Sequence, residues 1–193
     1  MNLSNHFLIA APALDEGPFA GSVVYVCEHN QEGAMGVIIN KPSPIPMQAV
    51  FAGNGGDTPE RFAEDFVLFG GPVHPERGFV VHTPAGEWQS TLKVNGADDN
   101  GVTTSRDIVE NLGDEEKVAK AFLTIGYASW EKGQLERELA ENSWLTVAAD
   151  NAILFDLPAG KRYRAALAKL GIEQVNLMLS LIHISEPTRP LYI

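Results

Sequence analysis

The chain has 193 residues, of which 45% are apolar and 20% are charged, and its formal net charge is −11 at pH 7. This composition excludes a disordered or fibrous protein, and the length is sufficient for one hydrophobic core without stabilising disulfides. The negative charge repels phosphate backbones, so we expect no direct binding to DNA or RNA.

The first expected strand covers residues 7–10. Residues 22–27 are β-branched and aromatic with almost no polar break, which is typical of a strand covered on both faces, and we expect it to be the central strand. Gly33 marks a turn before a further strand at 35–40. The sequence therefore predicts an antiparallel hairpin here.

Short strands and short helices alternate along the rest of the chain. Further strands are expected at 66–69, 78–82, 91–94, 122–128 and 144–148. Helices are expected at 44–53, 105–112, 133–142 and 162–170. This order predicts a mixed α/β (α+β) fold with a largely antiparallel sheet, in a single domain over residues 1–178.

The sequences at the two ends of the chain bear on targeting and on the origin of the carboxyl terminus. The amino-terminal apolar run is short, lacks a basic leader and is broken by Pro12, so we expect neither a signal peptide nor a membrane span. With a single cysteine, this predicts a cytoplasmic protein. LSLIHISEPTR, residues 179–189, resembles a translated sequencing adapter. We therefore expect residues 179–193 to be a foreign tail that replaces the natural carboxyl terminus.

Sequence motifs for common chemistries are absent. There is no Gly-Lys-Ser/Thr P-loop, no dinucleotide fingerprint and no G-x-S-x-G nucleophile elbow, and NGADDNG lacks the EF-hand spacing. The sequence thus predicts no cofactor and no metal. The densest basic group, Lys161, Arg162 and Arg164, falls on one predicted helix turn and is interpreted as a solvated helix face.

Cys27 and His29 stand two residues apart, so a regular strand would place them on the same face. Three interpretations are open. Cys27 is a small buried hydrophobic residue beside a hydrogen-bonded histidine, or its thiol has a lowered pKa and is reactive. The third is a metal site that also uses His74 or His82.

Four segments together resemble the YqgE/AlgH family of bacterial proteins: HFLIAAPAL, SVVYVCEHNQEGAMGVIINKP, FGGPVHPERGFVVHTP and GYASWEKGQLERELAENSWL. The resemblance implies a bifurcated, barrel-like sheet and a cytosolic protein of unsettled activity, with a link to transcriptional regulation of alginate production. The residues of these segments that we single out as site candidates are Cys27, Glu28, His29, Asn40, Lys41, Gly70, Gly71 and Trp130.

The sequence and the resemblance together predict a non-enzymatic regulatory or protein-interaction domain. Its partner would be an unidentified protein, and any transcriptional role would be indirect, because the net charge opposes contact with DNA. The alternative function is a thiol-based redox sensor or enzyme in which Cys27 reacts and His29 tunes it. A small-molecule binding domain is a third possibility.

Overall fold

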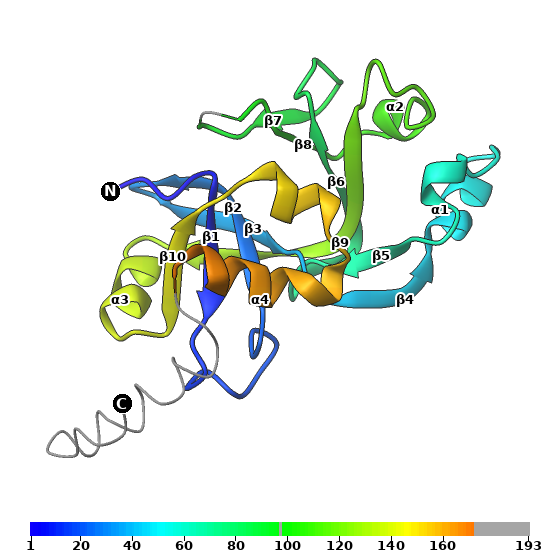
Figure 1. Cartoon of the computed structure of the whole chain (residues 1–193). Coiled ribbons are helices and arrows are strands. Elements are labelled where there is room, and N and C mark those ends of the chain that lie inside the picture. The colour runs from blue at the N-terminus through cyan, green and yellow to red at the C-terminus, as the bar shows by residue number, and fades with distance from the viewer. Residues whose placement is uncertain (97, 172–193) are drawn as a thin grey trace, which may run out of the picture.

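The computed structural model describes residues 1–96 and 98–171 (Figure 1). The predicted foreign tail, residues 179–193, lies outside the described residues. The described part is a mixed α+β fold in which one curled, mostly antiparallel sheet is accompanied by a few short helices. The predicted fold class is thereby confirmed.

The strands are short except for two long ones, β6 and β9. Their bounds are β1 His6–Ala10, β2 Val23–Asn30, β3 Gly33–Ile38, β4 Pro42–Pro46, β5 Phe66–Phe69, β6 Val73–Thr83, β7 Thr91–Lys93, β8 Gly101–Thr103, β9 Lys120–Glu131 and β10 Trp144–Ala148. The helices are α1 Met47–Gly53, α2 Arg106–Val109, α3 Gln134–Ala140 and α4 Ala159–Lys169, with a 3₁₀ turn η1 Glu60–Phe62 and a π-helical turn η2 Ala152–Asp156.

Strand β9 is the point at which the sheet divides. The main path of strands is β10-β1-β2-β3-β9-β6-β8-β7, and β5 also pairs with β9, with β4 beyond it. On the edge facing β3, β9 pairs antiparallel through residues 128–131, whereas Thr124 and Ile125 pair in parallel with β5. The strand therefore changes partner along one edge, which gives the bifurcated sheet that the family resemblance implied.

Glycines allow the backbone to cross at this fork. The amide of Gly70 donates to Ile125, and its carbonyl accepts from Ile38, so Gly70 links the two branches. A Cβ atom on Gly70 would overlap the carbonyl oxygen of Gly126, and one on Gly71 would overlap the backbone of Tyr127. Gly71 also has a positive φ of 153°. These positions therefore require glycine for the fold.

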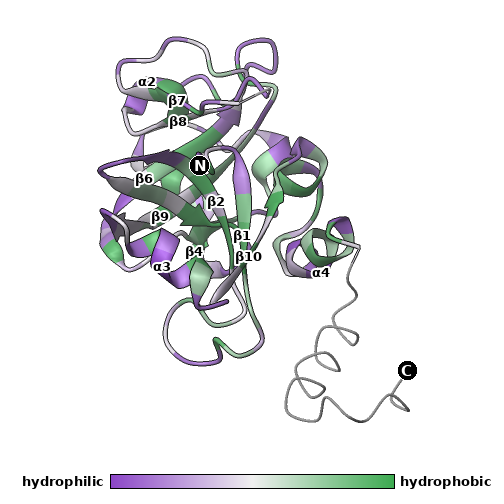
Figure 2. Cartoon of the chain, turned by 90° about the vertical axis from the view of Figure 1, so that its left-hand side faces the viewer, coloured by the Kyte–Doolittle hydropathy of each residue, from purple (hydrophilic) through white to green (hydrophobic). Residues whose placement is uncertain are grey.

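Strands β1, β2 and β3 are covered on both faces, by α4 on one and α3 on the other (Figure 2). Alternate β2 residues divide between the faces: Val23 and Tyr25 pack on the α4 side, and Val24 and Val26 on the α3 side. The α4-side core includes Phe7, Ile9, Val23, Tyr25, Cys27, Val37, Ala166 and Leu167. The α3-side core includes Leu3, Leu8, Val24, Val26, Ile38, Trp130, Leu135 and Trp144.

Some expectations about individual elements need correction. The β2–β3 hairpin is present, but β9 rather than β2 is the strand with the most partners. The helix expected at 105–112 is shorter, Arg106–Val109, and is followed by turns. Strands β4 and β8 were not predicted, because β4 contains three prolines and β8 has only three residues.

Candidate ligand cleft

Cys27 and His29 lie on opposite sides of the sheet, so the expectation that they share a face is wrong. Val26 pairs with Gly36 and Glu28 pairs with Met35, which leaves Cys27 as the extra residue of a β-bulge. The bulge shifts the alternation of side chains by one residue. Cys27 consequently packs in the α4-side core, and the ring of His29 meets residues of the α3 side.

The thiol of Cys27 is buried, with 1% of its surface exposed. Its Sγ donates to the carbonyl of Tyr25 at 3.6 Å. Burial raises the pKa of the thiol to about 12, with a smaller contribution from the carboxylate of Glu28. The thiol therefore stays protonated at neutral pH while the strand is folded, which matches the interpretation of Cys27 as a small buried hydrophobic residue.

His29 joins the amino terminus to α3. Its Nδ1 accepts from the amide of Leu3 at 2.9 Å, and its Nε2 lies 3.2 Å from Oε2 of Glu136. The backbone amide of His29 donates to the hydroxyl of Ser4. Both ring nitrogens and the backbone amide of this buried histidine thus have a partner, and the arrangement holds the first residues of the chain against the sheet.

Trp130 belongs to an aromatic group on the α3 side. Its ring is 6.0 Å from that of Trp144, measured between centroids. The Nε1 atoms of both tryptophans donate to Oε1 of Glu138, at 3.0 Å and 2.9 Å, and Gln134 donates to the other carboxylate oxygen. Both tryptophans are 4% exposed, so they serve packing and do not present a stacking surface.

The remaining site candidates do not form one cluster. Asn40 accepts from the amide of Val23 and donates to the carbonyl of Gly21, and Lys41 donates to the carbonyl of Pro18. These two side chains close the loop before β2. The side chain of Glu28 is exposed, and Gly70 and Gly71 form the fork described above.

The histidines considered for a metal site are apart from one another in their contacts. His74 is bonded to the exposed Glu76, while the buried His82 contacts the hydroxyl of Thr103 and the carbonyl of Pro84. Burial lowers the pKa of His82. Within residues 1–96 and 98–171, no three histidine, cysteine or acidic side chains are grouped to hold a metal ion.

The most distinctive hollow lies where β5 and β9 meet the start of α4, and we call it the α4 cleft. Its volume is about 410 Å³. Most of its lining is apolar: Pro42, Met47, Phe62, Phe66, Leu68, Ala121, Phe122, Leu123, Phe155, Leu157, Pro158 and Ala159. Four charged residues complete it, namely Glu64, Asp65, Asp156 and Arg162.

Arg162 is a buried charge at this cleft, and the expectation that it forms part of a solvated helix face is wrong. Only 5% of its surface is exposed. Its Nε donates to the carbonyl of Leu157 at 3.1 Å and its Nη1 to that of Ile39 at 2.7 Å, while Nη2 has no hydrogen-bond partner among the described residues. The guanidinium also lies 5.0 Å from the ring centroid of Phe122. Burial lowers the pKa of Arg162 to about 10, and the field of Asp65 opposes this shift.

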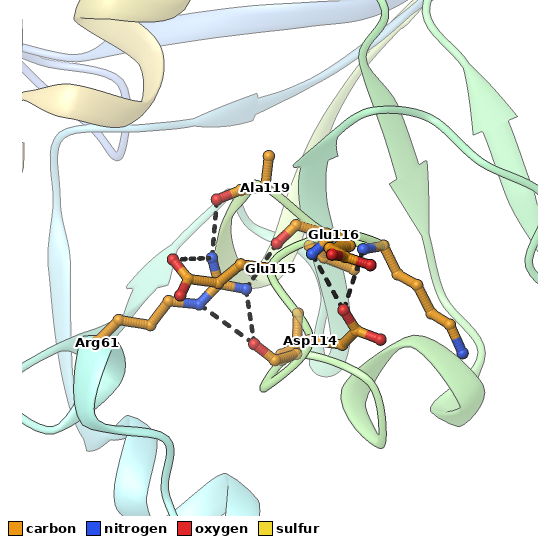
Figure 3. Close-up of polar contacts among 8 residues, drawn as sticks. Arg61, Asp114, Glu115, Glu116 and Ala119 are labelled. Atoms are coloured by element: carbon orange, nitrogen blue, oxygen red, sulfur yellow. Dashed lines mark hydrogen bonds and ion pairs between the residues drawn. The ribbon is translucent and has the colours of Figure 1, made fainter.

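Arg61 shows what a fully paired arginine looks like in the same molecule (Figure 3). Its guanidinium donates to the carbonyls of Leu112, Val118 and Ala119 through all three nitrogens. Glu115 adds an ion pair at 3.9 Å. In contrast, the ion pairs found among the described residues include none for Arg162. The charge of Arg162 is therefore the less compensated of the two.

The sequence contained a signal for the burial of Arg162. The residue is four positions before Ala166 and five before Leu167, and both of these belong to the α4-side core. Residues spaced by four lie on one side of a helix, so Arg162 falls on the buried face and only Lys161 and Arg164 on the exposed one. A second hollow of about 510 Å³ along α4 includes those two exposed side chains in its lining and contains no buried charge.

No helix among the described residues is both long and apolar enough to cross a membrane.

The fold and the α4 cleft define a mixed α+β domain with a forked sheet and one ligand-sized hollow that contains a buried arginine.

Comparison with known sequences identifies the family of this domain. A family model described as AlgH-like matches residues 7–175, and the chain belongs to this family. It is 56% identical over 177 residues to a UPF0301 protein of Neisseria meningitidis serogroup B, covering 92% of this chain and 96% of the relative. A UPF0301 protein of Chromobacterium violaceum is 49% identical over 176 residues, with 90% and 92% covered. The predicted YqgE/AlgH resemblance is thereby confirmed.

Two solved structures share the fold. The solution structure of the AlgH protein from Pseudomonas aeruginosa matches with a TM-score of 0.73 and 40% identity, over 92% of this chain and 94% of that one. A crystal structure of a protein from Corynebacterium diphtheriae matches with a TM-score of 0.60 and 22% identity, over 78% of each chain. The second likeness concerns the fold alone.

Proposed function

We propose that the protein is a non-enzymatic interaction domain that acts through a protein partner in the cytoplasm, with a regulatory role that needs no direct contact with DNA. The observation that carries this proposal is the exposure of two large apolar side chains on adjacent strands: Ile45 on β4 is 37% exposed, and Phe66 on β5, which pairs with Pro46, is 50% exposed. Exposed apolar side chains that are grouped on a surface are typical of sites where proteins associate.

The geometry of β4 limits how a partner binds there. Among the described strands, β4 pairs only with β5, so its other edge is open. Pro42, Pro44 and Pro46 have no backbone N–H to donate, which opposes the addition of a further strand. The partner therefore contacts Ile45 and Phe66 through side chains.

Affinity capture from the native host at physiological salt tests this function. Wild-type protein is compared with the double variant Ile45→Ser/Phe66→Ser, and with Glu141→Ser as a control on the exposed surface of the α3 side. We expect one partner that binds the purified wild type and control saturably and binds the double variant at least about tenfold more weakly. Recovery of no partner, or equal binding of the folded double variant, would contradict the proposal.

The thiol alternative has less support from the structure. A reactive cysteine requires an accessible thiolate, whereas Cys27 is buried and its pKa is raised. His29, which the thiol alternative requires beside Cys27, contacts Leu3 and Glu136 on the opposite side of the sheet. The interaction function is therefore the better supported of the two.

A further inference from the structure

We propose that the α4 cleft binds a small monocarboxylate with an apolar body, whose carboxylate is held by Arg162 and the first turn of α4. This ligand is a different molecule from the protein partner proposed above, although Phe66 borders both the cleft and the partner surface. Its test needs only the purified chain, so its failure and the failure of the interaction function are distinguishable.

The guanidinium of Arg162 is incompletely paired. A buried guanidinium is stabilised when its donors are bonded and its charge is compensated. Here Nε and Nη1 bond only to backbone carbonyls, and Nη2 is left without a hydrogen-bond partner among the described residues. Because Arg162 lines the cleft, an anionic group entering it can accept from these remaining donors.

The amino-terminal end of α4 opens onto the same cleft. Leu157, Pro158 and Ala159 all line it. Pro158 is the N-cap, no side chain caps the helix, and the first turn contains no acidic residue. The amide of Lys161 donates to the carbonyl of Pro158, so the amides of Ala159 and Gly160 and the partial positive charge of this 11-residue helix are left without a partner among the described residues. The end of the helix and the guanidinium of Arg162 therefore both favour binding of an anion in the same cleft.

The apolar lining indicates the rest of the ligand. Leu68, Phe122, Leu123 and Phe155 come from three different elements and converge on the cleft. A volume of about 410 Å³ is within the range of small-molecule sites. It accommodates an apolar chain or ring of roughly eight carbon atoms beside the charged group.

The acidic rim indicates the charge of the ligand. Glu64, Asp65 and Asp156 border the cleft, and burial raises the pKa of the Asp65 carboxyl group while Arg162 opposes the rise. Asp156 is paired with Lys120 at 2.6 Å, so Glu64 and Asp65 repel an incoming anion more strongly. A single negative charge is therefore favoured over a phosphate dianion.

The experiment titrates the purified chain with three probes that share an eight-carbon chain: octanoate, 1-octanol and octylammonium. Amide NMR shifts locate each probe. We expect octanoate to bind with a dissociation constant of about 1 mM or tighter, and to shift the amides around Leu68, Phe122 and Ala159. 1-Octanol lacks the charged group and should bind about tenfold more weakly than octanoate. Octylammonium carries the opposite charge and should bind more weakly than 1-octanol.

Three variants separate recognition of the carboxylate from packing. Arg162→Met should weaken octanoate about tenfold and leave 1-octanol unchanged. Asp65→Asn removes a repelling charge and should tighten octanoate about threefold, and it remains informative if Arg162→Met fails to fold. Glu141→Gln lies on the α3 side, remote from the cleft, and should change neither the affinity for octanoate nor the affinity for 1-octanol.

Several results would overturn the proposal. These are equal affinity for octanoate and 1-octanol, tighter binding of octylammonium, or shifts centred outside the cleft. An absence of octanoate binding at about ten times the expected dissociation constant would also do so. So would an Asp65→Asn variant that binds octanoate no better than the wild type.

Discussion

The two faces of strands β1, β2 and β3 differ in how completely their buried polar groups are paired. On the α3 side, the indole nitrogens of Trp130 and Trp144 share Glu138, and His29 meets Glu136. On the α4 side, the guanidinium of Arg162 is bonded to backbone carbonyls alone. The α3 side is thus complete by itself, whereas the α4 side leaves a charge available at a cleft.

This difference separates stability from function. Buried groups whose partners are all supplied by the chain contribute to folding, and their replacement leaves a neighbour unpaired. A buried charge that is hydrogen-bonded to no carboxylate contributes less to folding and is available to a ligand. We therefore expect substitutions on the α3 side to destabilise the protein more than substitutions at Arg162.

The largest expected effect follows replacement of Trp130 by alanine. This removes a 4% exposed indole from the α3-side core, and we expect the free energy of unfolding to fall by about 3–5 kcal/mol. Urea denaturation followed by circular dichroism measures it. Phe66→Ala is the matched aromatic control, since Phe66 is 50% exposed and should lose less than about 1 kcal/mol. A loss for Trp130→Ala as small as that of the control would contradict the assignment of Trp130 to the core.

A smaller loss is expected for Glu138→Ala. The substitution leaves the indole N–H groups of Trp130 and Trp144 without their acceptor, at a cost of about 2 kcal/mol. Glu141→Ala changes the same residue type just after α3 at an exposed position, and should stay within about 0.5 kcal/mol of the wild type. Equal stability of the two variants would show that the shared carboxylate does not hold the tryptophans.

Much of the fold could be predicted from local patterns. The strands Phe66–Phe69 and Trp144–Ala148 have the predicted bounds, because compact apolar runs between turn residues specify strands locally. The fork could not be predicted, because it depends on β9 pairing with β3 and β5 along one edge. Such pairings join residues far apart in the chain, and nothing in the local pattern of β9 reveals them.

The candidate site was harder to predict for a related reason. The bulge at Cys27 leaves no mark in the local sequence, so the regular alternation of a strand gave the wrong face for His29. The burial of Arg162 was detectable from its spacing to Ala166, but its acceptor Ile39 lies on a distant segment. Family-like residues such as Asn40 and Gly70 were predicted as site residues, and their contacts in the structure are with the backbone of the fold.

A pH-dependent effect is expected from Cys27. Its pKa is raised from 9.0 to about 12, so between these values the unfolded chain releases a proton that the folded chain retains. The folded state then binds more protons, and stability falls as pH rises. Between pH 7 and pH 10 the wild type should lose roughly 1 kcal/mol more than Cys27→Ala, as measured by urea denaturation. Parallel losses in the two proteins would contradict the burial of the thiol.

The smallest effect is expected for Arg162→Met. The substitution leaves the carbonyls of Leu157 and Ile39 without this donor, at a cost of roughly 1 kcal/mol each, and removal of a desolvated charge offsets most of this cost. The net loss in unfolding free energy should therefore stay below about 1 kcal/mol, less than half that of Glu138→Ala. Urea denaturation of Arg162→Met and Glu138→Ala measures the two unfolding free energies that are compared. If Arg162→Met proved as destabilising as Glu138→Ala, Arg162 would be a structural residue like Arg61, and the contrast between the two faces would not hold.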